Sequence, residues 1–318
     1  MCIQKKKIFI DGSEGTTGLR IFERFENRDD IELLKIPSES RKDPAAVRQF
    51  IHDSDITFLC LPDAASREAA ALAADEDVIL IDTSTAHRTE PGWAYGYPEL
   101  SEKHREAIRT GRRIAVPGCH ATGFITLVYP LIANGLLAPA CPVSAFSLTG
   151  YSGGGKKMIA EYEGADRDEE LLSPRQYGLS QMHKHLKEMK AVTGLAREPL
   201  FSPIVADYYS GMLVSVPLYA DMLNGTQTPE SIHGMFEEHF AGEPFVTVMP
   251  FGAEADCRNF LGSNNRSGWD GIEIFVTGNE DRILLSSRFD NLGKGASGAA
   301  VQCLNIVLGC SETKGLNL

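Results

Sequence analysis

The stretch Lys7-Ile-Phe-Ile-Asp-Gly-Ser-Glu-Gly-Thr-Thr-Gly18 decides the fold of this chain. An apolar strand ends at Asp11, and apolar residues recur at helical spacing after Gly18. Glycines in such a turn let the backbone approach a pyrophosphate, and the helix N-terminus adds partial positive charge. The spacing is GxxGxxG, a variant of GxGxxG, and its place between a first strand and a first helix predicts a dinucleotide-binding turn. The residues expected to contact the cofactor are Gly12, Gly15, Thr16, Thr17 and Gly18.

The residues after the second predicted strand, 31–36, indicate which dinucleotide binds. An NAD site usually carries an acidic residue there, whereas an NADP site carries hydroxyl groups and a cation. Ser38 and Arg41 stand at this place, about 20 residues beyond the glycines. Glu39 fits an NAD site instead, unless its side chain points away. The segment therefore favours NADP(H).

Strands and helices alternate through the first third of the chain. Further strands are predicted at 56–61, 78–81 and 114–116, with helical patterns between them. This alternation predicts a Rossmann-like, doubly wound parallel sheet, in which ligands bind at the carboxyl ends of the strands.

A cysteine follows the last of these strands, in the stretch Arg113-Ile-Ala-Val-Pro-Gly-Cys-His-Ala-Thr-Gly-Phe124. Cys119 stands between a strand end and a helical run that starts near Thr122. Unpaired N–H groups and the helix dipole lower the pKa of a thiol in that position and favour the thiolate. A buried, inert thiol is the alternative. The expected position on the ligand-binding edge of the sheet favours the reactive thiol.

The pattern changes after residue 138. Strands are predicted at 143–149, 211–219, 245–249, 271–277 and 282–289, with a helix near 229–240. This is typical of a second, α+β domain with a mixed or antiparallel sheet. A last apolar helix, 299–308, is expected to return to the first domain. We therefore predict a cofactor domain over 1–118 and 297–318, and a catalytic and dimerisation domain over 119–296.

Two segments of the second domain carry candidate site residues. Ser152, Gly153 and Gly154 precede two lysines, and their backbone could form an anion-binding nest or an ordinary flexible loop. Residues 161–177 are charged and polar, and are expected at the surface. His183 and His185 lie in a predicted helix capped by Ser180. Their spacing does not suit a helical metal pair, so no metal site is predicted.

Composition limits the class of function. A net charge of -12 over 318 residues argues against binding to nucleic acid. Seven cysteines without CxxC spacing predict neither a disulfide framework nor a zinc site, which fits a cytoplasmic protein. No signal peptide or transmembrane helix is predicted. The sheet of the second domain makes a homodimer or homotetramer the expected assembly.

A dinucleotide turn, a strand-end cysteine and a distant histidine together predict one mechanism. The thiolate attacks an acyl group and forms a thioester, and NADPH delivers hydride to the thioester carbonyl. A histidine accepts the thiol proton and later returns a proton. The same parts run in reverse as a phosphorylating aldehyde dehydrogenase.

Within the families that share this plan, Pro117-Gly-Cys-His-Ala-Thr-Gly123 resembles the PGC motif of the N-acetyl-γ-glutamyl-phosphate reductases. Segments 11–20, 82–88, 95–100 and 290–298 agree with that family, and His183-Lys-His185 resembles its HRH-like segment. The chain length and the His-Ala-Thr after the cysteine resemble the shorter type. The resemblance implies reduction of N-acetyl-γ-glutamyl phosphate, a small acyl phosphate, to N-acetyl-L-glutamate 5-semialdehyde in arginine biosynthesis.

The resemblance also implies roles for single residues. Cys119 is the nucleophile, and one of His183 and His185 is the acid/base, with His183 slightly favoured. Asn291 would meet the nicotinamide carboxamide. Arg88 is the candidate for the substrate carboxylate or phosphate, because a guanidinium matches either, although a surface salt bridge would also explain it. His120 is a rival base by sequence proximity, but a structural role suits it better.

Two alternatives stay open at this point. The first is a related acyl-phosphate reductase or semialdehyde dehydrogenase of the aspartate type, with another amino-acid substrate. The second is a non-catalytic NADP-binding sensor that kept the fold.

Overall fold

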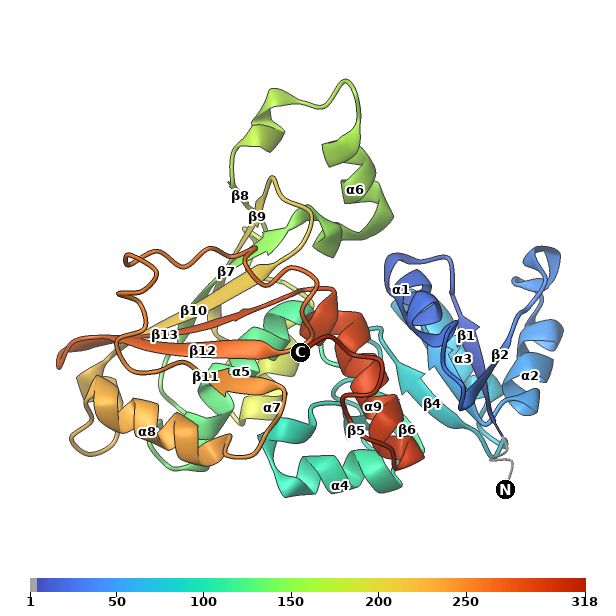
Figure 1. Ribbon diagram of the computed structural model, residues 1–318, viewed down its shortest axis with the longest axis horizontal. Coiled ribbons are helices and arrows are strands. Elements are labelled where there is room, and N and C mark those ends of the chain that lie inside the picture. The colour runs from blue at the N-terminus through green and yellow to red at the C-terminus, as the bar shows by residue number, and fades with distance from the viewer. Residues whose placement is uncertain (1–4) are drawn as a thin grey trace. The chain divides into compact units, whose positions relative to one another are not determined.

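The computed structural model describes residues 5–318, which form two compact units. Unit 1 combines the chain up to Gly118 with Ala296–Leu316, and unit 2 combines Cys119–Gly295 with Asn317–Leu318. Figure 1 shows the strands of unit 1 in blue and cyan, while its last helix, α9, is red because it comes from the far end of the chain.

The described part of unit 1 holds a six-stranded sheet with the order β2-β1-β3-β4-β6-β5, and neighbouring strands are parallel. Its strands are β1 (Lys6–Asp11), β2 (Ile31–Leu34), β3 (Ile56–Leu59), β4 (Ile79–Asp82), β5 (Ala94–Tyr95) and β6 (Arg113–Ala115). The chain runs from β1 to β2 on one side and returns to β3 on the other. The carboxyl ends of β1 and β3 therefore form the switch point at which such sheets bind ligands.

Helices cover both faces of this sheet. They are α1 (Thr16–Phe25), α2 (Pro44–Asp53), α3 (Asp63–Leu72), α4 (Glu102–Thr110) and α9 (Gly298–Leu308). One core joins the sheet to apolar residues of α1, α4 and α9, and a second joins it to those of α2 and α3. The predicted doubly wound fold is confirmed.

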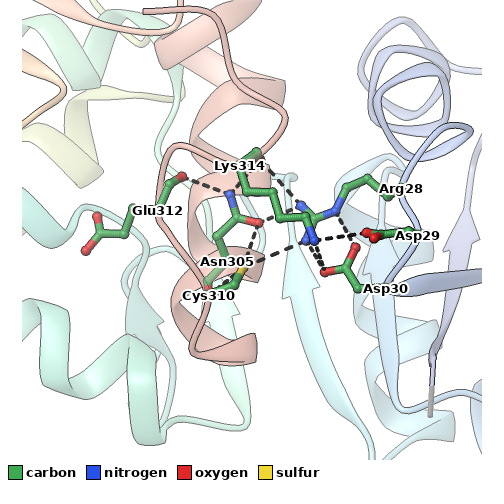
Figure 2. Close-up of polar contacts among 7 residues, drawn as sticks. All are labelled: Arg28, Asp29, Asp30, Asn305, Cys310, Glu312 and Lys314. Carbon is green, nitrogen blue, oxygen red and sulfur yellow. Dashed lines mark hydrogen bonds and ion pairs between the residues drawn. The ribbon is translucent and has the colours of Figure 1, made fainter. Parts of the chain in front are cut away.

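A buried polar network fastens the segment after α9 to the rest of unit 1 (Figure 2). The Arg28 guanidinium donates to both carboxylate oxygens of Asp30, at 3.0 and 2.7 Å, and to the Asn305 side-chain oxygen at 2.6 Å. Asn305 in turn donates to the backbone carbonyls of Glu312 and Lys314. Arg28 is only 8% exposed, so these bonds replace the water it loses on folding.

The sheet of unit 2 has the order β11-β12-β13-β10-β7-β9-β8 among the described residues and mixes parallel with antiparallel pairs, as predicted. Its strands are β7 (Ser144–Gly150), β8 (Arg175–Gln176), β9 (Leu200–Ala206), β10 (Met212–Tyr219), β11 (Val246–Val248), β12 (Ile272–Gly278) and β13 (Arg282–Phe289). Strand β9 was not predicted, because Pro203 interrupts its pattern and proline is rare inside a sheet.

Helices α7 (Leu186–Thr193) and α8 (Pro229–His239) both pack on α5 (Cys119–Ala133), and α5 and α8 contact the sheet of unit 2. Gly123 brings α5 close to that sheet. A Cβ at Gly123 would lie 2.5 Å from Val214 and 2.8 Å from Phe289, so only glycine fits this contact. The glycine of the cysteine motif therefore has a packing role.

The segment with α6 (Gly155–Glu163) extends away from the sheet of unit 2 (Figure 1). The prediction that residues 161–177 lie at the surface was wrong for part of them. Tyr162 and Leu171 are buried with Val205 of β9, and Tyr177 packs against this cluster. The charged residues between them conceal the apolar spacing in the sequence.

Candidate active site

Cys119 is the first residue of α5, three residues before the expected start of the helix. The strand β6 ends at Ala115, and the intervening residues turn the chain directly into the helix. The first N–H groups of a helix have no partner within it, and its dipole stabilises negative charge at that end. The half-buried thiol therefore has a setting that favours its ionised form.

The segment 290–298 reaches this cysteine. A Cβ at Gly295 would lie 3.0 Å from the Cβ of Cys119 and 3.2 Å from the Asp290 carbonyl oxygen. Gly295 belongs to a short π-helical turn, Gly293–Ser297, just before α9. Two stretches singled out in the sequence, far apart along the chain, are thus in contact.

His120 is the second residue of α5 and is buried, with 3% exposure. Its Nδ1 lies 2.6 Å from the Ser147 hydroxyl oxygen, and its Nε2 lies 2.6 Å from the Tyr177 hydroxyl oxygen. The pKa of His120 is lowered to about 3, mainly by burial and also by the charges of His183 and Lys184. His120 is therefore neutral at neutral pH, with both ring nitrogens engaged.

His183 and His185 join His120 in one cluster of rings. The ring centroids of His120 lie 5.3 Å from those of His183 and 5.6 Å from those of His185, and the latter two are 4.8 Å apart. Burial is the main cause that lowers the pKa of His183 to about 4. His185 is buried, whereas His183 is partly exposed. Because His120 directly follows Cys119, the cluster includes a residue of the first turn of α5.

The predicted helix start at Ser180 was wrong, because α7 begins at Leu186. Gln181 has a φ of 56°, a left-handed conformation that a helix cannot contain. Its side-chain amide bonds to the backbone N–H and carbonyl of Phe201 in β9. These tertiary bonds hold the two histidines in a turn, where both can face His120.

Ser152 and Asn291 are bonded to each other. The Asn291 side chain donates to the Ser152 hydroxyl at 3.0 Å and accepts from the Gly211 N–H at 2.9 Å. Ser152, Gly153 and Gly154 form a short 3₁₀ turn immediately before α6. Both side chains are 2% exposed, so Asn291 fixes the position of the glycine turn.

Arg88 lies in unit 1, in the loop after β4. Its guanidinium donates to the Val116 and Thr83 carbonyls, at 2.8 and 3.0 Å, and so ties together the segments that follow β6 and β4. Asp82 organises the same loop by accepting from both Ser66 and Ser84 at 2.8 Å. Arg88 remains partly exposed.

The glycine turn after β1 has the geometry of a phosphate-binding loop. Gly12 has a φ of 85°, and a Cβ there would lie 2.3 Å from the Cys60 carbonyl oxygen at the end of β3. A Cβ at Gly18 would lie 2.3 Å from the Gly12 carbonyl oxygen. Gly15 is the N-cap of α1 and provides no side-chain cap, so the first N–H groups of this helix receive no bond from a capping side chain.

A cavity of about 210 Å³ adjoins this turn. Arg41, Lys35 and Ser13 line it, and the buried Nε of Arg41 has no hydrogen-bond partner among residues 5–318. Glu14 forms an ion pair with Arg41. Ser38 lies outside the cavity lining, on an exposed 3₁₀ turn.

Sequence reasoning missed Tyr177, Ser147 and Lys35. Tyr177 stands in a polar segment without periodicity, and Ser147 is one of several serines on predicted strands. Lys35 had a usable signal, since it lies at the end of the second strand where the cofactor preference is set.

Neither a metal cluster nor a membrane span is visible in the described chain. Within residues 5–318, no three His, Cys, Asp or Glu side chains are grouped to hold an ion. No helix of the same residues is long and apolar enough to cross a membrane.

Two family models match this chain, one within each unit. Residues 42–109 match the model of the semialdehyde dehydrogenase NAD binding domain, and residues 119–291 match that of the semialdehyde dehydrogenase dimerisation domain. N-acetyl-gamma-glutamyl-phosphate reductase 2 of Nostoc sp. is 44% identical, over 99% of this chain and 100% of that protein. The chain belongs to the N-acetyl-γ-glutamyl-phosphate reductase family. The reductase of Brucella ovis is also 44% identical, over 96% of this chain and 99% of its own length.

Solved structures of this wider family share the fold. Aspartate semialdehyde dehydrogenase II of Vibrio cholerae has a TM-score of 0.71 at 16% identity, with 96% of this chain and 99% of that chain covered. The Candida albicans enzyme, solved with NADP, has a TM-score of 0.63 at 13% identity, with 96% and 99% covered. At these identities the likeness concerns the fold alone.

Proposed function

We propose that this member of the reductase family catalyses the NADPH-dependent reduction of N-acetyl-γ-glutamyl phosphate. The products are N-acetyl-L-glutamate 5-semialdehyde and phosphate, and the step belongs to arginine biosynthesis. The observation that carries the proposal is the position of Cys119, which is the first residue of α5 and adjoins a cluster of three histidines. Full-length relatives that are 44% identical bear the name of this reductase.

The residues of unit 1 fit NADPH. The glycine turn can pack this tightly before the N-terminus of α1, where a pyrophosphate would bind, only because Gly12 and Gly18 have no Cβ. Arg41 and Lys35 line the adjoining cavity and match a 2′-phosphate in charge. When bound, NADPH supplies the hydride that reduces the acyl group. Ser38 would contribute only from the rim of this site.

On unit 2, Cys119 carries the acyl group through the reaction. Its thiolate attacks the acyl carbon, the bond to the phosphate oxygen breaks, and a thioester forms with release of phosphate. After reduction of the thioester carbonyl, the tetrahedral oxyanion collapses to the aldehyde and returns the electron pair to sulfur. A thioester accepts hydride far more readily than a carboxylate, which explains the need for the cysteine.

His183 is the proposed acid/base. Its Nδ1 accepts the His185 backbone N–H at 3.3 Å, so the neutral ring carries its hydrogen on Nε2. A bound phosphate dianion would raise the pKa of His183 from its depressed value, because negative charge favours the imidazolium. The protonated ring then donates to the departing phosphate. His185, at 4% exposure, suits a positioning role.

Two groups are proposed to hold the anionic ends of the substrate. Arg88 offers its partly exposed guanidinium, whose orientation is set by the Val116 and Thr83 carbonyls. The backbone of Ser152, Gly153 and Gly154 offers a second anion site, kept in place by Asn291. A contact between Asn291 and the nicotinamide stays a prediction.

Each unit has its own proposed role: unit 1 binds the cofactor, and unit 2 carries the catalytic residues. We further propose a homodimer, or a dimer of dimers, that forms through the sheet of unit 2. A catalytic thiol has to stay reduced, which makes the cytoplasm the proposed compartment.

The experiment that tests the function is the reverse reaction. NADP reduction is followed with N-acetylglutamate semialdehyde and phosphate, and with aspartate semialdehyde as the competing substrate. We expect a large preference for the former, and mass spectrometry should find the N-acetylglutamyl group on Cys119. Cys119→Ser should lose turnover but still bind NADP, whereas Cys141→Ser, half-buried in the same unit, should keep turnover.

A preference for aspartate semialdehyde would reject the proposed substrate. Normal turnover of Cys119→Ser would reject the thioester mechanism. NADP binding without any turnover in the wild type would favour a sensor.

A further inference from the structure

A hydrogen-bonded chain of three side chains runs beside Cys119 in unit 2. Ser147 of β7 contacts Nδ1 of His120, and Nε2 of the same ring contacts the Tyr177 hydroxyl, each at 2.6 Å. Ser147 is 0% exposed and His120 is 3% exposed, so water does not compete for these bonds. Because His120 follows Cys119 directly, the chain lies at the first turn of α5.

His120 can only be neutral in this place, since burial holds its pKa near 3. A neutral imidazole has one N–H donor and one acceptor nitrogen. If Ser147 donates to Nδ1, the hydrogen of the ring is on Nε2 and is donated to the Tyr177 oxygen. The Tyr177 O–H is then left to donate to a further group.

Cys119, which directly precedes His120 in α5, is the candidate for that further group. Tyr177 is half-buried, and its ring packs against His183 at 5.9 Å between centroids. Burial is the main cause that raises the pKa of Tyr177, and the charge of Cys119 adds to it. The raised pKa keeps the phenol protonated, and hence a donor, at every working pH.

Packing and a backbone hydrogen bond also fix the position of Tyr177. It packs on the small core of Tyr162, Leu171 and Val205, which belongs to the α6 segment and β9. The Tyr177 backbone N–H donates to the Pro203 carbonyl at 3.0 Å. Its hydroxyl is therefore oriented by the His120 ring and its backbone by the edge of the sheet.

We propose that Tyr177 is a catalytic residue whose hydroxyl donates a hydrogen bond at the sulfur of Cys119, and that His120 and Ser147 are positioning residues that orient this hydroxyl. The same donor would face the oxyanion that forms on the acyl carbon bound to that sulfur. The inference deepens the proposed function, on which it rests. It also removes His120 as a base, because both of its nitrogens are engaged.

The test measures the thiol without any substrate. The rate at which iodoacetamide alkylates Cys119 is followed against pH, with the modified residue identified by mass spectrometry. Tyr177→Phe removes the hydroxyl and keeps the ring. We expect the midpoint of the profile to rise by about one to two pH units, the effect of losing a hydrogen bond to a charged group. Tyr151→Phe, in the same small core, is the matched control and should leave the midpoint unchanged.

Two variants of His120 test the positioning role. His120→Gln keeps an N–H near the place of Nε2, whereas His120→Leu has no donor. The midpoint should stay near the wild-type value in the first variant and rise as in Tyr177→Phe in the second. Combining His120→Leu with Tyr177→Phe should add nothing, because both remove the same hydrogen bond. Turnover should fall about 100- to 1000-fold with either His120→Leu or Tyr177→Phe.

An unchanged midpoint in Tyr177→Phe would overturn the proposal. So would a His120→Gln profile equal to that of His120→Leu. Circular dichroism reports whether each variant is folded, and if His120→Leu is not, Tyr177→Phe and His120→Gln decide. The alkylation profile does not depend on which acyl phosphate is the substrate, so an error in the proposed substrate would leave this result valid.

Discussion

Two glycines and the buried carboxyl of Asp11 show how single residues determine the local geometry and charge of the candidate site. Gly295 lies so close to Cys119 that an added methyl group would displace one of them. Gly12 needs both its positive φ and its missing side chain to let the turn approach β3. Asp11, directly before Gly12, is 8% exposed, and burial raises its pKa to about 6. The glycine turn is thus preceded by a carboxyl group whose pKa is raised by burial.

Asp11 should make the stability of the protein depend on pH. Its folded-state pKa of about 6 lies above the unfolded value of 3.8, so the folded chain holds this proton more tightly. The tighter proton binding contributes its full free energy to folding below about pH 4, and this contribution is lost as the pH rises through about 6. Asp11→Asn should therefore be more stable than wild type by up to about 3 kcal/mol at pH 7.5, and equal to it at pH 4.

Thermal unfolding of both proteins at the two pH values measures this difference. Asp75→Asn changes an exposed carboxylate of the same unit and is the control, with no effect expected at either pH. A gap between Asp11→Asn and wild type that is as large at pH 4 as at pH 7.5 would mean that the carboxyl does not titrate as described.

At the scale of elements, the beginning and end of the chain depend on one another. Helix α9 contacts α1 and α4 and contributes to the core on one face of the parallel sheet. The segment after α9 has few apolar residues, so polar bonds have to hold it. Arg28 provides them, together with Asn305 and Asp30 (Figure 2).

Removal of Arg28 should destabilise unit 1 strongly. Arg28→Met keeps the apolar volume but removes the main donor of two acceptors. Among the described residues, the Asp30 carboxylate then keeps only Lys314 as a side-chain partner, and the Asn305 oxygen keeps only the Cys310 thiol. Breaking a buried pair in this way costs about 3–5 kcal/mol. Urea unfolding measures the loss, and limited proteolysis should cut first within the segment after α9.

Arg48→Met is the matched control for that change. Arg48 has 55% of its side chain exposed and lies 3.7 Å from Glu76. Such a surface ion pair contributes little to the free energy of unfolding. Should both variants lose the same stability, the network around Arg28 would have no special role.

At the scale of the whole molecule, one face of the sheet in unit 2 is rich in exposed apolar side chains. Phe146, Leu200, Tyr219 and Leu284 are 47%, 67%, 57% and 38% exposed. Strand register places all four on the face opposite to the one that packs on α5. Exposed apolar patches of this kind mark interaction surfaces. A second copy of the chain is the expected occupant, since the matching family model is named a dimerisation domain.

A charge on this face should therefore disrupt the assembly. We expect sedimentation to give a dimer or tetramer for the wild type, and a lower mass for Phe146→Glu and Leu284→Lys, because each would bury an unpaired charge. Leu172→Glu alters an equally exposed leucine outside the sheet and should keep the assembly. Dissociation by Leu172→Glu but not by the sheet variants would place the interface on the α6 segment.

Sequence reasoning was strongest where a local pattern has a single physical cause. The glycine turn, the alternation of strands and helices, and the mixed sheet all follow from backbone sterics and apolar periodicity, and the structure confirms them. It was weakest where distant contacts override local preference. Gln181, clamped to Phe201, breaks the helix expected from Ser180, and β9 forms in spite of Pro203.

The sequence by itself determined the fold class and the family and predicted the nucleophilic cysteine, because each depends on residues that are neighbours along the chain. The tertiary structure decided what surrounds that cysteine. Ser147, His120 and Tyr177 come from β7, α5 and the end of the α6 segment, and they meet only because the sheet brings these elements together. Hydrogen bonds between residues so far apart in the chain leave no periodic pattern in the sequence, so they cannot be predicted from it.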